Sequence, residues 1–218
     1  MDTTHRTYLP AAGHDWMLPL YDPLVRLLGG DQARRALLDQ AALEPTGRVL
    51  DVGCGTGTLI VMIARQHPNV RVVGLDPDPK ALARAERKAQ QAAVSVQLDR
   101  AFSDALPYPD DSFDRVFSSL MLHHLEAEQK QKTLREVRRV LKPGGSLHLL
   151  DFARPDSRNT TGFVRWVHSH HRLHDNTVER VIRLMQEAGF SDARLVRQGA
   201  LLMGRIAYFE ARTPGRDD

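Results

Sequence analysis

The chain has a single cysteine, Cys54, among its 218 residues. One cysteine cannot form a disulfide within a chain, which excludes the disulfide-stabilised scaffolds of small secreted proteins. No apolar run approaches the ~18 residues of a membrane-spanning helix, and the polar first ten residues lack the basic-then-apolar layout of a secretory signal. We therefore expect a protein without a membrane span, located in the reducing environment of the cytoplasm.

An excess of charge of one sign is missing as well. Lys and Arg number 30 against 27 Asp and Glu, and the arginines are scattered through the chain instead of forming a block. This distribution argues against a dedicated nucleic-acid surface, so we expect no nucleic-acid partner. The hydrophobic content of 42% is ordinary for a globular protein. The length allows one domain, or one domain with a small cap.

The segment from Arg48 to Ile60, RVLDVGCGTGTLI, has the pattern of a ligand-binding turn. An apolar strand pattern at 49–52 is followed by a glycine-dense turn at 53–57 and an apolar helical run at 59–64. Glycine permits positive φ and lets a ligand approach the backbone closely. The first N–H groups of the following helix lack partners within the helix and carry partial positive charge. The segment therefore predicts a strand–turn–helix cradle.

The residues around this turn limit the kind of ligand. The dinucleotide fingerprint G-x-G-x-x-G fits imperfectly, because Thr58 stands where the third small residue belongs. Asp51, just before the turn, would repel a pyrophosphate, whereas its negative charge suits an ammonium or a sulfonium group. We interpret Cys54 as a small residue that fills the turn, with a catalytic thiol as the alternative.

A second acidic residue, Asp76, follows the glycine turn at the sequence spacing that is typical of nucleotide-binding folds. The run 70–75 predicts a second strand, and Asp76 ends it about 20 residues after the glycines, where an acidic residue meets ribose hydroxyls in nucleotide-binding folds. The alternative role for Asp76 is that of a helix cap, because an alanine-rich helix is predicted at 78–91.

Two adjacent histidines lie where chemistry is expected. The runs 94–98 and 113–118 predict the third and fourth strands, and the segment 119–125, SLMLHHL, leaves the fourth. Ligands of open α/β sheets bind beyond the carboxyl ends of the strands, so His123 and His124 are candidates for a general base. The alternative is that one packs at the strand–helix junction and the other faces solvent.

Further motifs complete a family resemblance. After the D-x-G-x-G-x-G turn come D-x-L-P at 104–107, S-F-D at 112–114, H-H-L at 123–125 and L-K-P-G-G at 141–145. In this order they resemble the class I S-adenosylmethionine-dependent methyltransferases. The likeness is to the small-molecule type 11 group, which includes the quinone-biosynthesis C-methyltransferases, and it runs from about residue 48 to 151.

The alternation of strands and helices favours a mostly parallel sheet with helices on both faces. The resemblance implies an α/β fold of the Rossmann-like kind, with a seven-stranded, mostly parallel sheet whose last strand is antiparallel. It also implies methyl transfer from S-adenosylmethionine to a small-molecule acceptor at oxygen, carbon, nitrogen or sulfur, with S-adenosylhomocysteine as the product. We expect no metal ion, and a monomer or a homodimer.

The resemblance also implies which residues hold the cofactor. The turn and Asp51 would surround its methionine part, Asp76 and Pro77 would bound the ribose, and Asp104 with Ala105 would meet the adenine. Ser119 and Leu120 would form the floor beneath the sulfonium. The expected cofactor-binding residues are Asp51, Gly53, Cys54, Gly55, Gly57, Asp76, Pro77, Asp104, Ala105, Ser119 and Leu120.

Two other functions stay open at this point. The fold could bind S-adenosylmethionine without turnover, as a sensor or an assembly subunit. It could also methylate protein or nucleic acid, although Ser118-Ser119-Leu120-Met121 stands where base amino-methyltransferases have an Asn/Asp-Pro-Pro-Tyr/Phe motif.

We expect a single methyltransferase domain with four parts. A helical cap covers 1–45, the cofactor-binding core 46–151, an insertion that forms a lid or substrate wall 152–174, and a C-terminal helix with two strands 175–212. Aromatic residues of the cap and the insertion are candidates for the substrate wall: Tyr8, Trp16, Tyr21, Phe163 and Trp166. We interpret the histidines at 168, 170, 171 and 174 as structural or solvated, because no cysteine or regularly spaced acidic residue accompanies them. The alternative is that His171 and His174, three residues apart, share a helix face and bind a metal.

Overall fold

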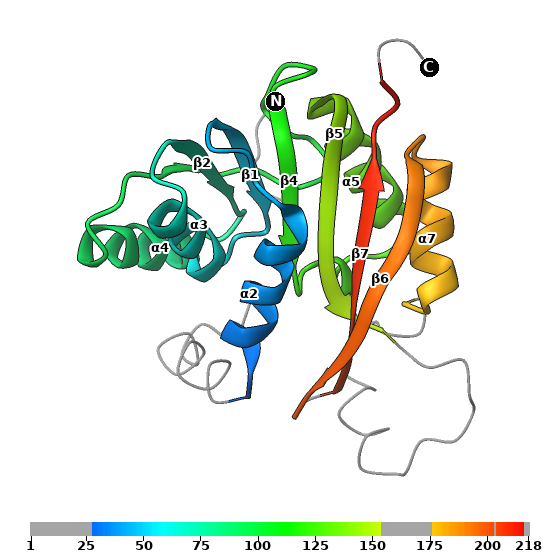
Figure 1. Ribbon diagram of the computed structural model, residues 1–218, viewed down its shortest axis with the longest axis horizontal. Helices are drawn as coiled ribbons and strands as arrows, with labels where there is room; N and C mark the ends of the chain where they lie inside the picture. Colours follow the sequence, from blue (N-terminus) through cyan, green and yellow to red (C-terminus); the bar gives the residue numbers. More distant parts are fainter. Residues whose placement is uncertain (1–27, 154–175, 203, 216–218) are drawn as a thin grey trace.

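The computed structural model describes residues 28–153, 176–202 and 204–215. Its centre is one seven-stranded sheet with the strand order β3-β2-β1-β4-β5-β7-β6 (Figure 1). The strands are β1 (Gly47–Val52), β2 (Val70–Leu75), β3 (Gln97–Asp99), β4 (Phe113–Ser119), β5 (Leu141–Phe152), β6 (Ser191–Leu201) and β7 (Gly204–Arg212). The helices are α2 (Gly30–Ala41), α3 (Thr58–Gln66), α4 (Pro79–Gln91), the 3-10 turn η2 (Leu122–His124), α5 (Ala127–Val140) and α7 (Val178–Glu187).

The first five strands are parallel, and β7 pairs with both β5 and β6 in the antiparallel sense. Parallel strands are buried on both faces, so they need continuous apolar runs. The run Val49-Leu50 of β1 and the run Val72-Val73 of β2 meet this need, and they lie opposite each other in the sheet.

Helices cover both faces of the sheet, and each face has its own hydrophobic core. On one face, α5 and α7 pack residues such as Leu134 and Met185 against the strands. On the other face, α2, α3 and α4 contribute Leu37, Ile60 and Ala85. In Figure 1, α2 crosses in front of the sheet while α5 and α7 lie behind it. The expected seven-stranded, Rossmann-like architecture with an antiparallel last strand is confirmed.

The order of the strands fixes where a ligand can bind. The chain builds β1, β2 and β3 toward one edge, then returns to place β4 on the other side of β1. Such a reversal leaves a crevice outside the carboxyl ends of the two central strands. The turn after β1 and the segment after β4 therefore meet at the same edge of the sheet.

The predicted bounds of the third strand were wrong. The third strand was expected at 94–98, but β3 covers only Gln97–Asp99. The L-K-P-G-G motif at 141–145 lies within β5, directly after α5 ends at Val140. Thr177 caps α7, and its side chain accepts a hydrogen bond from Arg180 N.

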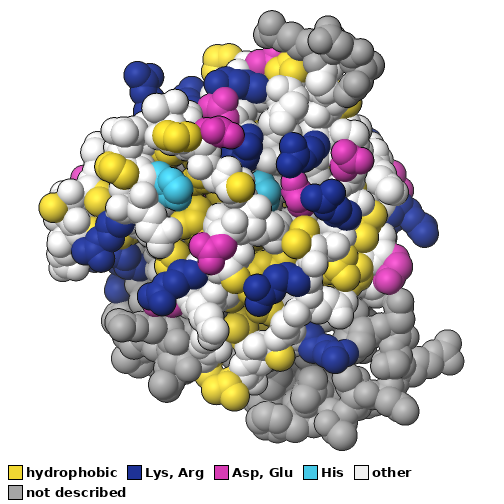
Figure 2. All heavy atoms as spheres, viewed as in Figure 1, with side chains coloured by type: hydrophobic (Ala, Val, Ile, Leu, Met, Phe, Trp, Pro, Cys, Tyr) yellow, Lys and Arg dark blue, Asp and Glu magenta, His cyan; other side chains and the backbone are white. Residues whose placement is uncertain are grey.

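The division into four parts stays a prediction, since most of the cap and the insertion lies outside the described residues. Within the described part of the chain, no helix is long and apolar enough to cross a membrane. On the face shown in Figure 2, basic, acidic and apolar side chains are interspersed rather than gathered into one basic block.

Candidate functional site

The glycine turn after β1 has the geometry that the sequence predicts. Gly53 and Gly57 have φ values of +72° and +79°, a region that side chains rarely enter. A Cβ at Gly57 would come within 2.7 Å of Ala85 Cβ on α4, and a Cβ at Gly53 would collide with Met121. The backbone N–H groups of Gly53 and Cys54 both donate to Leu75 O, which ties the turn to β2.

Asp76 is held in place by the backbone on both sides. Gly55 N donates to Asp76 Oδ2 and Asp78 N donates to Asp76 Oδ1, each at 2.9 Å. Burial raises the pKa of Asp76 to about 6, although the two backbone donors oppose that rise. The cap of α4 is Asp78, which accepts from Lys80 N at 2.8 Å, so the alternative that Asp76 caps this helix is wrong. Each carboxylate oxygen of Asp76 has a second lone pair for a ligand hydroxyl.

Asp51 is the most deeply buried acid of the site, with 1% of its surface exposed. Burial raises its pKa to about 8, while the positive charge of Arg34 on α2 acts in the opposite direction. Asp51 Oδ1 has no hydrogen-bond partner among the described residues. An unpaired buried oxygen of this kind is costly unless a ligand or a water molecule satisfies it.

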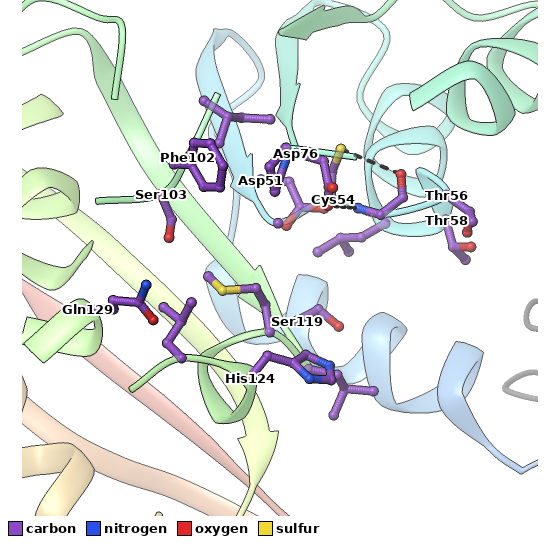
Figure 3. Close-up of a pocket in the computed structure, with 18 of the residues that line it drawn as sticks. Asp51, Cys54, Thr56, Thr58, Asp76, Phe102, Ser103, Ser119, His124 and Gln129 are labelled. Atoms are coloured by element: carbon purple, nitrogen blue, oxygen red, sulfur yellow. Dashed lines mark hydrogen bonds between the residues drawn. The ribbon is translucent and has the colours of Figure 1, made fainter. Parts of the chain in front are cut away.

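These residues surround a cavity of about 340 Å³ at the carboxyl edge of the sheet (Figure 3). One side is formed by Arg34, Asp51, the glycine turn, Leu75, Asp76 and Pro77, and the other by residues that follow β3 and β4. The described lining residues are Arg34, Asp51, Gly53, Cys54, Gly55, Thr56, Thr58, Leu59, Leu75, Asp76, Pro77, Phe102, Ser103, Ser119, Leu120, Met121, His124, Leu125, Glu126 and Gln129.

The segment after β4 enters the cavity through a strained turn. Leu120 has a φ of +57°, which is a genuine outlier for a bulky residue. Its backbone N–H donates to Leu150 O at 2.8 Å, and this bond holds the turn against β5. Ser119 Oγ is buried and has no hydrogen-bond partner within the described part of the chain. Strain together with an unsatisfied hydroxyl is typical of a ligand site.

The two adjacent histidines are in different surroundings. His124 lines the cavity, and Figure 3 shows it beside Ser119, across from the glycine turn. His123 is 4% exposed and is not among the lining residues; its Nδ1 lies 2.6 Å from Asp151 Oδ1 on β5. In a 3-10 turn, consecutive side chains project about 120° apart, so neighbours face different surroundings.

The two residues expected to contact adenine are not among the described residues that line the cavity. Phe102 and Ser103 line the cavity, whereas Asp104 and Ala105 are not among its described lining residues. Ser103 Oγ lies 2.9 Å from Thr133 Oγ1 on α5, which fixes this loop against the helix. The adenine contacts of Asp104 and Ala105 stay predictions, and the structure adds Phe102 as an aromatic surface at this end.

Other sequence predictions fall outside the described residues. Tyr8, Trp16, Tyr21, Phe163 and Trp166, the proposed substrate wall, all belong to this group, as do the histidines at 168–174. Cys54 lies within the turn, and burial raises the pKa of its thiol well above the usual range. A protonated thiol is a poor nucleophile, which agrees with its interpretation as a small filling residue.

Sequence reasoning missed Arg34, Phe102, Met121 and Gln129 as lining residues. Arg34 is 8% exposed, and a buried arginine in an otherwise apolar helix face was the one signal that could have been noticed. The residues present fit S-adenosylmethionine. Asp51 and Arg34 would take the ammonium and carboxylate of its methionine part, Asp76 its ribose hydroxyls, and the bare glycine backbone allows close approach.

Comparisons with known proteins agree with this geometry. Residues 49–145 match the family model described as a methyltransferase domain. The chain is 40% identical over 140 residues to a demethylmenaquinone methyltransferase of Thermus thermophilus, a stretch that is 63% of each protein. It is 36% identical over 159 residues to an uncharacterized methyltransferase of Synechocystis, which covers 72% of this chain and 71% of that one.

A solved structure extends the likeness of fold to nearly the whole chain. The [4+2]-cyclase SpnF matches with a TM-score of 0.73 and 19% identity, over 96% of this chain and 98% of that one. At this identity the likeness shows the fold alone. The identity with the Synechocystis protein, the matched domain and the residues that line the cavity lead to one assignment: the chain belongs to the class I S-adenosylmethionine-dependent methyltransferases.

Proposed function

We propose that the chain transfers a methyl group from S-adenosylmethionine to a small-molecule acceptor, with His124 as the general base. The observation that carries the proposal is that His124 and the cofactor turn line the same cavity. S-adenosylmethionine, when bound, supplies an electrophilic methyl group. The protein must then hold the acceptor in line with that group and receive the acceptor's proton.

The described residues divide this work between two sides of the cavity. Asp51, Arg34 and Asp76 would hold the ammonium, the carboxylate and the ribose of the cofactor, which fixes the direction of its methyl group. Positioning of this kind can contribute several kcal/mol to lowering the barrier, in the range of ~7–11 kcal/mol for ideal alignment. His124 would accept the proton of an acceptor O–H, N–H, S–H or acidic C–H as the new bond forms, a contribution of about 10²–10⁴-fold.

The lining beyond the cofactor turn supports an acceptor with apolar surface and hydrogen-bonding groups. Met121 and Leu125 supply the apolar surface, and Gln129 supplies polar atoms. The Thermus relative is named for a demethylated quinone. We therefore propose reduced quinones as the first acceptors to test. The aligned region covers only 63% of that relative, so other aromatic hydroxyls and small thiols should be tested as well.

The test is turnover of purified full-length protein with S-adenosylmethionine and each acceptor in turn. Short-chain demethylmenaquinol, a catechol, phosphoethanolamine and a small thiol would represent the classes, and S-adenosylhomocysteine release would be measured. We expect release with at least one acceptor, and a loss of about 10²-fold in His124→Gln. The matched control is His67→Gln, the same change at the end of α3 and outside the cavity.

The outcome of this test also distinguishes methyl transfer from the alternative function, cofactor binding without turnover. Tight binding of S-adenosylhomocysteine, without turnover against any acceptor, would favour a non-catalytic sensor or assembly subunit. Full activity of His124→Gln would instead keep the methyltransferase and remove the base. Loss of cofactor affinity in Asp76→Ala, with an unchanged melting temperature, would support the ribose contact.

A further inference from the structure

We propose that Asp151 is a positioning residue, which acts through His123 to hold the imidazole of His124 toward the methyl-transfer point. The inference rests on the proposed function and deepens it, because it assigns different roles to the two adjacent histidines. Asp151 lies near the end of β5, is fully buried, and is outside the set of lining residues.

The Asp151 carboxylate is hydrogen-bonded to three groups around it. Its Oδ1 lies 2.6 Å from His123 Nδ1 and accepts from Phe152 N at 2.7 Å. Its Oδ2 accepts from the backbone N–H of His123 at 3.0 Å. One carboxylate therefore binds both the ring and the backbone of His123, and it ties the 3-10 turn η2 to the end of β5.

This arrangement fixes the His123 ring as well as the turn. A carboxylate only accepts hydrogen bonds, so His123 Nδ1 carries a proton that points at Asp151. The ring of Phe152 meets the His123 ring edge to face, with centroids 5.1 Å apart and planes at 78°. A ring with a carboxylate at one nitrogen and a phenyl group against it has little freedom to rotate.

The fixed ring in turn supports His124. The two imidazole centroids lie 4.0 Å apart with their planes tilted by 39°, which is direct contact. His124 is the member of the pair that lines the cavity, next to Ser119 in Figure 3. A catalytic group whose rotamer is set by packing against a second, hydrogen-bonded layer keeps its productive geometry without a loss of entropy on each turnover.

The bonds, electrons and proton of the methyl transfer are all accounted for with this assignment of roles. The bond between the sulfonium sulfur and the methyl carbon breaks with its electron pair left on sulfur, and an acceptor lone pair forms the new bond. The acceptor's proton passes to a ring nitrogen of His124, the only member of the three groups that reaches the cavity among the described residues. Asp151 receives no proton in this step; it keeps the orientation of the ring behind His124.

A purely structural role is the competing explanation, because the same hydrogen bonds would anchor η2 whatever the chemistry. Two substitutions of His123 separate the roles. In His123→Asn, the amide nitrogen can replace Nδ1 as the donor to Asp151, but no ring remains to contact His124. In His123→Phe, a ring remains without the hydrogen bond. Asp151→Asn removes the charge, and Glu210→Gln, a buried carboxylate on β7, is its matched control.

The experiment has one measurement that needs no acceptor. NMR of the S-adenosylhomocysteine complex, with labelled histidine, reports nuclear Overhauser contacts between the His124 ring and the bound compound. We expect Asp151→Asn and His123→Asn to lose these contacts, while the affinity for S-adenosylhomocysteine stays within about twofold of the wild type. Glu210→Gln should keep them. Unchanged contacts in both Asp151→Asn and His123→Asn would overturn the proposal, even if no acceptor had been found.

Turnover supplies the second measurement. With any acceptor that the wild type methylates, we expect Asp151→Asn and His123→Asn to lower kcat about tenfold or more, with KM within about twofold. His123→Phe should retain more of the activity than His123→Asn, since it keeps a ring against His124. If Asp151→Asn does not fold, His123→Asn decides the matter. Wild-type kcat in a folded His123→Asn would refute the positioning role, whereas inactivity of the wild type would refute only the proposed function.

Discussion

Asp51 makes a quantitative prediction about cofactor binding. Burial raises its pKa to about 8, with Arg34 acting against the rise and Asp76 adding to it. In the free protein at pH 7, about nine-tenths of the molecules then carry a proton on Asp51. A ligand ammonium next to this carboxyl group favours the ionised form. Binding of S-adenosylhomocysteine at pH 7 should therefore release about 0.9 of a proton per site.

The same pKa fixes the direction and size of the pH effect on affinity. Ionising a group whose pKa lies one unit above the working pH costs about 1.4 kcal/mol. Since the ligand binds the ionised form, the affinity should fall by about tenfold as the pH drops from 7 to 6. Asp76, whose pKa is raised to about 6, contributes only at the lower end of this range.

Calorimetry in two buffers of different ionisation enthalpy measures the released protons directly. The wild type should show release at pH 7, and Asp51→Asn should show almost none, with an affinity that varies little between pH 6 and 7. A wild-type protein that exchanges no proton on binding would refute the reasoning, because Asp51 would then be ionised already or would lie away from the ammonium. Asp51→Asn that retained the full release would assign the proton to another group.

Three further predictions follow from single residues. Arg34→Met should weaken S-adenosylhomocysteine binding about 10–100-fold, the range of a lost charge-assisted hydrogen bond, but should leave the binding of methylthioadenosine, which lacks the amino-acid part, unaffected. The control is the same change at the exposed neighbour, Arg35→Met. An equal loss of affinity for both ligands in calorimetry would contradict the assignment of Arg34 to the carboxylate. Asn176→Leu should cost about 1.5–3 kcal/mol in urea unfolding, because it removes a hydrogen-bond acceptor of the buried Lys130 ammonium. In contrast, Lys132→Met at an exposed pair with Glu128 should cost under about 0.5 kcal/mol. Burial lowers the pKa of His148 to about 4, so between pH 6.5 and 4 the unfolded chain binds more protons than the folded one. The free energy of unfolding should therefore fall by up to ~3 kcal/mol as the pH drops through this window. A His148→Gln variant with the same pH dependence would show that other groups cause it.

Local signals were sufficient to predict the framework of the fold. The apolar runs of β1 and β2, the glycine turn and the amphipathic α5 each carry a periodicity that depends only on neighbours in sequence. The strand ends depend on pairing, and the prediction for the third strand was wrong at this point. β3 is short because only Gln97–Asp99 lie opposite β2. The run 142–145 joins β5 because the chain after α5 is already extended at Leu141, which lies opposite Phe113 of β4.

Some of the residues that line the cavity could be predicted from the sequence, and others could not. Asp51, the glycines and Asp76 stand at the ends of strands, where parallel topology brings them together. Arg34 comes from a helix that precedes the sheet, and its position on an apolar helix face does not show that α2 packs against β5 and α3. Phe102 lies in a loop whose conformation is set by the contact of Ser103 with α5. Residues positioned by tertiary contacts alone leave no pattern in a single sequence.

The positions of His123 and His124 also depend on tertiary contacts that a single sequence does not reveal. The sequence pattern does not distinguish the surroundings of the two residues, since they are adjacent histidines after the same strand. Their separation depends on Asp151, which is 28 residues away and meets η2 only because β5 pairs with β4. A buried carboxylate at that strand end requires a donor, and the nearest side chain of the turn that can donate is His123. Burying His123 in this way leaves His124 at the cavity, so the sheet register decides which of the two adjacent histidines lines it.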